Sequence, residues 1–259
     1  MERADPAIWL TRFLQKRDLE RPDSATPLYA YRCSDAEFNE LADVLRSGTR
    51  PPVGYYERVT RVGAALFCLY SAEWWRRTHE RGPWKWAGIL EGVGWGGISF
   101  PRLYEVIEEG LGYWRRPLLR VGPNRGFLVT LACEGGLPLR LVTSEGTSLR
   151  YYLLAVLEEF QLYGSAGYTP EELAARASEL LPRSLRQDVV YRLSGQLIDE
   201  IWQLQRKVGG ASAPVRELDR TDPGWRGRLP LLVPDDVARA LLNPLVESRI
   251  TRSKPYFLL

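Results

Sequence analysis

Residues Ala64 to Arg77, AALFCLYSAEWWRR, form the longest strongly apolar run in the chain and decide the fold. At helical spacing Leu66 and Leu69 lie on one side of this run, and Phe67 lies on another, so no polar face remains. A helix that is apolar all round packs inside a protein. We therefore expect a central core helix from about Tyr56 to His79.

The rest of the chain is typical of a mainly helical protein. It has 259 residues, of which 45% are hydrophobic and 26% charged, enough to bury one substantial core or two smaller ones. We predict a mainly α (α+β) fold, a multi-helix globular domain of about seven to nine helices with one β-hairpin. Besides the central helix, apolar and capping patterns predict helices at Pro6–Arg17, Ser34–Gly48, Trp84–Glu91, Phe100–Trp114, Thr147–Leu162, from Thr169, along Val189–Val208 and at Asp235–Val246.

The β-hairpin is predicted where the hydrophobic period changes. Phe127–Cys133 and Leu137–Val142 are short apolar runs rich in β-forming residues, and the turn-like sequence EGG separates them. We therefore expect the hairpin near residues 127–142.

Composition changes again at Gly209. The sequence GGASAPVRELDRTDPGWRGRLPLLVP that starts there has glycine, proline and charge but no period. We predict a helical core domain over residues 1–208, a linker or long loop over 209–233, and a helix and tail over 234–259. The apolar end of the chain either docks into the fold or leads into a further domain of a longer protein.

Several classes of enzyme are excluded by residues that the chain lacks. With His79 as its single histidine, the chain cannot hold a paired-histidine metal site, and it has no P-loop sequence. Gly92, Gly94 and Gly97 fit the G-x-G-x-x-G pattern, but a helix is predicted before them where a dinucleotide site needs a strand. We expect no cofactor and no metal, and an enzyme is the less favoured interpretation.

Location and redox state follow from apolar runs and cysteines. No apolar run reaches the roughly 20 residues of a membrane span, and the first residues, MERADPAIWL, lack the layout of a secretory signal. Cys33, Cys68 and Cys133 are odd in number and widely spaced, which favours buried thiols over disulfides or zinc ligands. We predict a cytoplasmic protein without a membrane partner.

Glu73 is the carboxylate that the pattern singles out, because it shares a helix face with Leu66 and Leu69. A buried acid needs a partner, and Arg77 at i+4 is the local one. We favour a structural ion pair over a catalytic acid. His79 follows at the helix end, where we expect a solvated or capping role.

Arginine carries nearly all the positive charge and gathers after two predicted helices. The candidate nucleic-acid-binding residues are Arg76, Arg81, Arg115, Arg116 and Arg120, followed by Arg125, with Trp84 and Trp86 as stacking partners. A solvated rim is the alternative for the arginines, and aromatic packing between helices is the alternative for the tryptophans.

Three short motifs carry a family resemblance. LYSAEWWRR, GPWKWAGIL and EGGLPLRLV resemble the N-terminal region of a family of large bacterial defence-island proteins, the non-helicase component of Druantia-type antiphage systems. The resemblance implies a partner helicase, a role in resisting phage DNA, and a longer chain. We expect a nucleic-acid-associated module of a defence protein, with DNA favoured over RNA. The alternatives are a scaffold that docks protein partners through a Trp-rich surface, and an unrecognised enzyme.

Overall fold

The chain folds into two compact units. The computed structural model describes residues 5–22, 26–48, 59–78, 85–121, 123–143, 146–209 and 211–242. Unit 1 is Met1–Pro138 and unit 2 is Leu139–Leu259. The sequence predicted one domain over 1–208, and the structure places the division inside that range.

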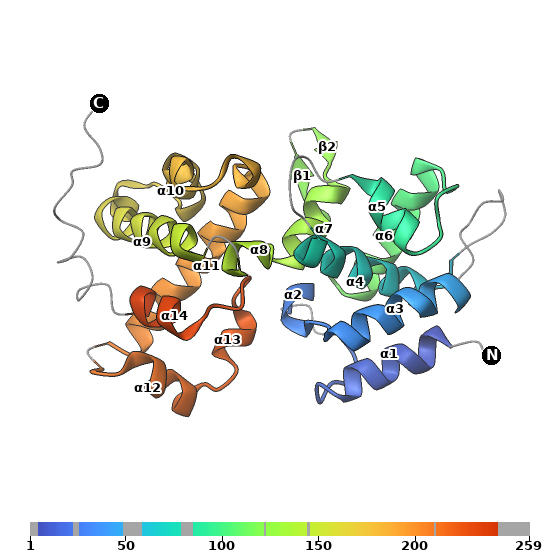
Figure 1. Ribbon diagram of the computed structural model, residues 1–259, viewed down its shortest axis with the longest axis horizontal. Coiled ribbons are helices and arrows are strands. Elements are labelled where there is room, and N and C mark those ends of the chain that lie inside the picture. The colour runs from blue at the N-terminus through green and yellow to red at the C-terminus, as the bar shows by residue number, and fades with distance from the viewer. Residues whose placement is uncertain are drawn as a thin grey trace. The chain divides into compact units, whose positions relative to one another are not determined.

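Unit 1 is built mainly from helices that pack around a buried central helix. Its elements are α1 (Pro6–Gln15), α2 (Leu28–Tyr31), α3 (Asp35–Gly48), α4 (Arg61–Thr78), α5 (Trp86–Gly92), α6 (Phe100–Tyr113), β1 (Arg120–Val121), β2 (Asn124–Arg125) and α7 (Phe127–Gly135) (Figure 1).

Helix α4 is the core of unit 1, as the sequence predicted. Its residues from Gly63 to Glu73 are all buried, and helices α1, α3, α6 and α7 pack against it. Helix α6 approaches closely because Gly110 has no side chain: a Cβ atom there would lie 2.3 Å from the carbonyl oxygen of Ala64. Close packing of this kind fixes the side chains that α4 carries.

The β-hairpin predicted near residues 127–142 is wrong. Residues Phe127–Gly135 form helix α7, and Arg140–Thr143 form helix α8. The two glycines that indicated a turn have other roles. Gly135 packs where a Cβ would lie 2.3 Å from the carbonyl oxygen of Ala72, and Gly136 ends the helix at a φ of 80°.

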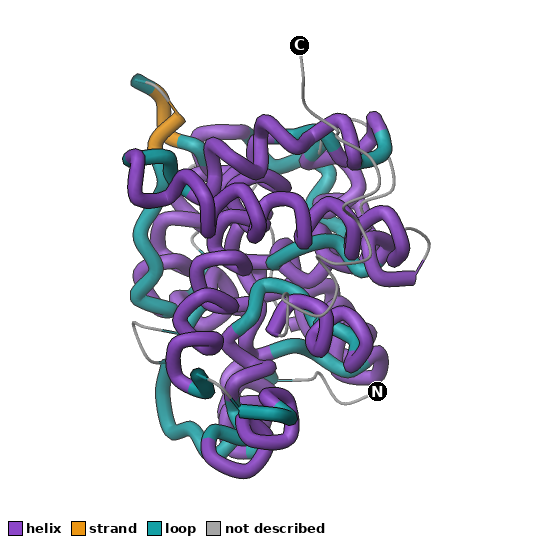
Figure 2. Tube along the Cα trace, turned by 90° about the vertical axis from the view of Figure 1, so that its left-hand side faces the viewer, coloured by secondary structure: helices purple, strands orange, loops and turns teal. Residues whose placement is uncertain are grey.

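A much shorter hairpin lies just before α7. Strands β1 and β2 pair antiparallel, with Arg120 opposite Arg125 and Val121 opposite Asn124. Figure 2 shows these two strands projecting from the helices around them.

Unit 2 is also helical. It contains α8, α9 (Gly146–Tyr163), α10 (Pro170–Arg176), α11 (Asp188–Lys207), α12 (Pro214–Thr221), α13 (Trp225–Arg228) and α14 (Asp235–Leu242), with short 3₁₀ turns at Gly164–Ala166, Ala177–Leu180 and Arg183–Leu185. The predicted apolar ladder of α11 is buried from Val189 to Leu204, and α10 begins with the predicted Thr169–Glu172 capping box.

The segment 209–233 differs from the linker or long loop that its composition suggested. Helices α12 and α13 lie within it, and Val215, Leu218 and Trp225 are buried there. Proline at the start of α12 accounts for part of the linker-like composition. The predicted apolar tail lies outside the described residues. Over the described ranges, no helix is long and apolar enough to cross a bilayer.

Candidate functional site

Glu73 stands at the centre of a buried ion-pair cluster. Its carboxylate is 2% exposed and accepts hydrogen bonds from Arg76 Nη2 at 2.5 Å and Arg77 Nε at 2.9 Å. It also accepts the backbone N–H of Cys33 at 3.1 Å. The predicted Glu73–Arg77 pair is confirmed, while Arg76 and Cys33 are additional partners.

Arg77 ties this cluster to the connector between α1 and α3. Its guanidinium donates to the carbonyl oxygen of Cys33 at 2.5 Å and pairs with Asp35. Burial lowers the pKa of Arg77, but its hydrogen bonds to Asp35 and Glu73 and the charges of these two acids together outweigh burial and raise it. Arg77 therefore stays charged and holds the connector from one side.

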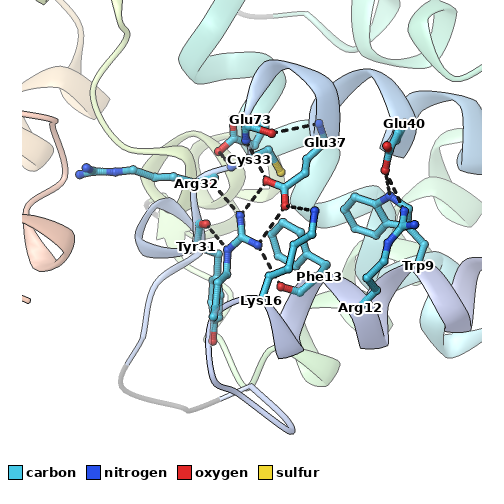
Figure 3. A network of polar contacts seen from close by, with 12 residues as sticks. Trp9, Arg12, Phe13, Lys16, Tyr31, Arg32, Cys33, Glu37, Glu40 and Glu73 are labelled. Carbon is cyan, nitrogen blue, oxygen red and sulfur yellow. Dashed lines mark hydrogen bonds and ion pairs between the residues drawn. The ribbon is translucent and has the colours of Figure 1, made fainter.

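A second, partly buried pair holds the same connector from the side of α1. Arg17 donates to the carbonyl oxygens of Tyr31 and Arg32 at 2.6 and 2.8 Å and to Glu37 at 2.9 Å. Figure 3 shows Glu37 among these groups, with Lys16 beside it. Burial raises the pKa of Glu37, but the hydrogen bonds from Arg17 and the backbone N–H of Ser34, together with the charges of Arg17 and Lys16, outweigh burial and bring the pKa to about 2.

Glu37 also closes a capping box at the start of the helix predicted over Ser34–Gly48. It accepts the backbone N–H of Ser34 at 2.9 Å, and the hydroxyl of Ser34 accepts the N–H of Glu37 at 3.2 Å. The same carboxylate thus caps α3 and pairs with Arg17, just after the end of α1.

The third buried acid is Glu134 on α7. It accepts Arg116 Nε at 2.8 Å and the backbone N–H of Leu28 at 2.9 Å. Burial raises the pKa of Glu134, and Arg116 opposes that rise. Together the three acids fix the residues from Leu28 to Ser34 through buried ion pairs and hydrogen bonds. This arrangement is structural, because each carboxylate is engaged by charged groups or backbone N–H groups of the fold.

The structure separates the predicted nucleic-acid residues into two groups. Arg76 and Arg116 are committed to Glu73 and Glu134, and their side chains are 10% and 17% exposed. Arg115 and Arg120 are exposed. Arg81, Trp84 and His79 lie outside the described residues.

The tryptophan rings are core residues wherever the structure describes them in unit 1, except for the half-buried Trp74. Trp86 is buried, so it presents no stacking surface. Trp75 donates through Nε1 to the carbonyl oxygen of Gly136 at 2.8 Å, and Trp114 donates to that of Ala65 at 2.8 Å. Trp95 stacks on Phe67 with centroids 4.7 Å apart. Aromatic packing between helices, the alternative to a binding surface, accounts for these rings.

The exposed arginines gather after α6. Between Glu109 and Glu134 the chain carries Arg115, Arg116, Arg120 and Arg125 and no acidic residue. Arg120 and Arg125 are directly opposite each other on β1 and β2, and Arg125 is 66% exposed and pairs with Glu108. We call residues 115–125 the basic hairpin segment.

Arg115 has a backbone conformation that favours glycine. It follows the last residues of α6 with a φ of 55°, and the N–H of Arg116 closes the helix end on the carbonyl oxygen of Leu111 at 2.9 Å. Left-handed residues at this position are usually Gly or Asn. The sequence showed the charge of this segment, but neither its left-handed bend nor the pairing of Arg120 with Arg125.

Comparison with known proteins gives the family. The family described as "YjiT N-terminal domain" matches residues 2–137, and the family described as "YjiT second domain" matches residues 144–255. The chain belongs to the YjiT family. The boundary between the two YjiT domains brackets the division after Pro138 that the structure shows. The matches do not connect the chain with Druantia-type antiphage systems.

A full-length YjiT relative is longer. The chain is 30% identical over 258 residues to "Protein YjiT" of Escherichia coli (strain K12), covering 95% of this chain and 48% of the relative. The chain therefore spans about half the length of this relative. No solved structure matches the chain.

Proposed function

We propose that unit 1 contacts a nucleic-acid backbone, without sequence preference, through the basic hairpin segment. The observation that carries the proposal is the Arg120–Arg125 pair. Like charges directly opposite each other on paired strands are destabilising. Glu108 pairs with Arg125 and can neutralise one of the two charges, so the hairpin holds more positive than negative charge on a projecting, exposed element.

Arg115 adds a second, independent argument. A left-handed conformation costs a residue with a side chain about 1–2 kcal/mol relative to the right-handed one, and glycine avoids that cost. Arginine is therefore less stable at this position than glycine would be, and it places an exposed cation there. Phosphate is a ligand that such an arginine fits, because the guanidinium presents a planar fork of donors.

The test compares Arg115→Gly and Arg120→Gln with the unchanged protein in fluorescence anisotropy, using labelled DNA and RNA at several salt concentrations. For each phosphate that a variant no longer neutralises, the slope of log affinity against log salt should fall by about 0.7–0.9. Arg220→Gln is the matched control, since Arg220 is an exposed arginine of unit 2 that pairs with Glu217 on its own helix.

Arg115→Gly separates binding from folding. We expect this variant to bind more weakly and to gain about 0.5–1 kcal/mol in the free energy of unfolding, because glycine relieves the left-handed strain. Absence of measurable binding by the unchanged protein to DNA or RNA at low salt would overturn the proposal.

The cellular role we attach to this contact is that of a module in a bacterial antiphage defence protein, acting with a partner helicase and favouring DNA over RNA. It is supported by the three sequence motifs that resemble a defence-island family. Plaque counts on cells with the intact gene, compared with cells carrying Arg115→Gly and Arg120→Gln together, test it. Equal plaque counts in the two strains would count against the role.

A further inference from the structure

An aromatic row lies along one side of α6 and ends at the basic hairpin segment. Phe100, the first residue of α6, is 57% exposed, and its ring centroid lies 6.1 Å from that of Tyr104. Tyr104 in turn stacks parallel on Phe127 with centroids 4.2 Å apart. Phe127 begins α7 directly after the hairpin, so the row joins an exposed ring to the base of the hairpin.

The hairpin arginines lie on the same side of α6 as this row. Phe100, Tyr104 and Glu108 recur every four residues, so each is turned about 40° from the one before it, and all three lie on one half of the helix. Glu108 pairs with Arg125 of the hairpin. At about 1.5 Å per residue, Phe100 and Glu108 are about 12 Å apart along the axis. An exposed ring and exposed cations therefore share one surface of unit 1.

The acids of α6 do not oppose an anionic ligand on this side. Glu108 is paired with Arg125, and Glu105 is paired with Arg102 at 2.6 Å. Glu109 is exposed but follows Phe100 by nine residues, which turns it about 180° away around the helix. The side that carries Phe100 is thus apolar and aromatic, next to a positive hairpin.

We propose that this surface binds a single strand of nucleic acid, with a base stacked on Phe100 and the backbone on Arg120. The inference rests on the proposed function and names its substrate class. A single strand offers unstacked base faces, which exposed aromatic rings bind, whereas a duplex keeps its bases stacked on one another. Phosphates of the same strand pair with Arg120, which lies opposite Arg125 on the hairpin. Arg125 in turn pairs with Glu108, about 12 Å from Phe100 along α6.

The test measures anisotropy of a labelled thymidine 15-mer, its duplex with an adenosine 15-mer, and an abasic strand of the same length. We expect the thymidine strand to bind the unchanged protein more tightly than either competitor. Phe100→Ala should weaken binding of the thymidine strand about 5- to 100-fold, as expected for one stacked base, and should leave binding of the abasic strand unchanged. Phe100→Leu should behave like Phe100→Ala, because leucine restores apolar area without a ring.

Ile8→Ala is the control, since Ile8 on α1 is 67% exposed and as apolar as Phe100. Because Phe100 is also largely exposed, its variants should keep the melting temperature of the unchanged protein. Equal affinity for single strand and duplex, with no effect of Phe100→Ala, would overturn this inference. The proposed backbone contact would still be supported if Arg120→Gln weakened binding. A complete absence of binding by the unchanged protein would overturn both.

Discussion

Glu73 should be the most sensitive ionisable residue of unit 1. We consider Glu73→Gln, which keeps the shape of the side chain and removes its charge. Arg76 and Arg77, at 10% and 15% exposure, are then without the carboxylate that lies 2.5 and 2.9 Å from them. Breaking a buried ion pair from one side costs about 3–5 kcal/mol, because the remaining charge stays buried without compensation.

This loss is large compared with the free energy of unfolding of an ordinary domain, which is about 5–15 kcal/mol. For a chain of this size each kcal/mol lowers the melting temperature by about 2–4 °C, so Glu73→Gln should lower it by about 6–20 °C. Asp35 cannot replace the missing charge for both arginines. It is 92% exposed, and it pairs with Arg77 but not with Arg76.

Denaturation by urea, followed by tryptophan fluorescence, measures this destabilisation. Seven of the nine tryptophans precede Pro138, so the signal reports mainly on unit 1. Glu40→Gln is the control: Glu40 is 51% exposed, pairs with Arg12 at 2.9 Å, and should cost at most about 1 kcal/mol. A destabilisation below about 1 kcal/mol for Glu73→Gln would show that the cluster does not depend on this charge, and the reasoning would fail.

Two further predictions concern packing and pH. Gly110→Ala should destabilise unit 1 by more than about 2 kcal/mol in the same urea assay, since its Cβ would lie 2.3 Å from a backbone oxygen of α4. The control is Gly112→Ala on the same helix, where the new Cβ meets nothing within 4 Å. This variant should be neutral or stabilising by up to about 1 kcal/mol. Similar effects of the two would contradict the close approach. Glu37, with a folded-state pKa of about 2 against an ordinary 4.5, stabilises the fold fully above pH 4.5 and progressively less as the pH falls towards 2. Glu37→Gln should therefore flatten the stability profile between those two pH values, and an unchanged profile would exclude Glu37 as its source.

The sequence was sufficient for the parts of the fold that local spacing determines. The all-round apolar pattern of Ala64–Arg77 predicts a buried helix, and Glu73 with Arg77 at i+4 predicts an ion pair on it. Long-range partners were beyond this reasoning, because Cys33 lies 40 residues before Glu73 and Leu28 lies 106 residues before Glu134. Those contacts depend on how α4 and α7 pack, which no local pattern encodes.

The failed hairpin has a physical cause. Phe127–Cys133 is short and apolar except for Thr130, and such a run fits a buried strand and a buried helix equally well by period. The two glycines after it indicated a turn, but Gly135 is there for close approach to α4 and Gly136 for the helix end. The candidate interface was predictable in part: the charge between Glu109 and Glu134 is visible in the sequence, whereas the exposure of Phe100 and the left-handed Arg115 are not.

The connector between α1 and α3 has a consequence for amide hydrogen exchange. The N–H groups of Leu28 and Cys33 donate to buried carboxylates that belong to α7 and α4, where an ordinary loop amide would meet solvent. Either amide can exchange with deuterium only after it separates from its carboxylate, and each carboxylate is held in a buried ion pair on α7 or α4. These two amides should thus exchange as slowly as those of the central helix, so that the short helix α2 and the residues after it belong to the last cooperative unit of unit 1 to open.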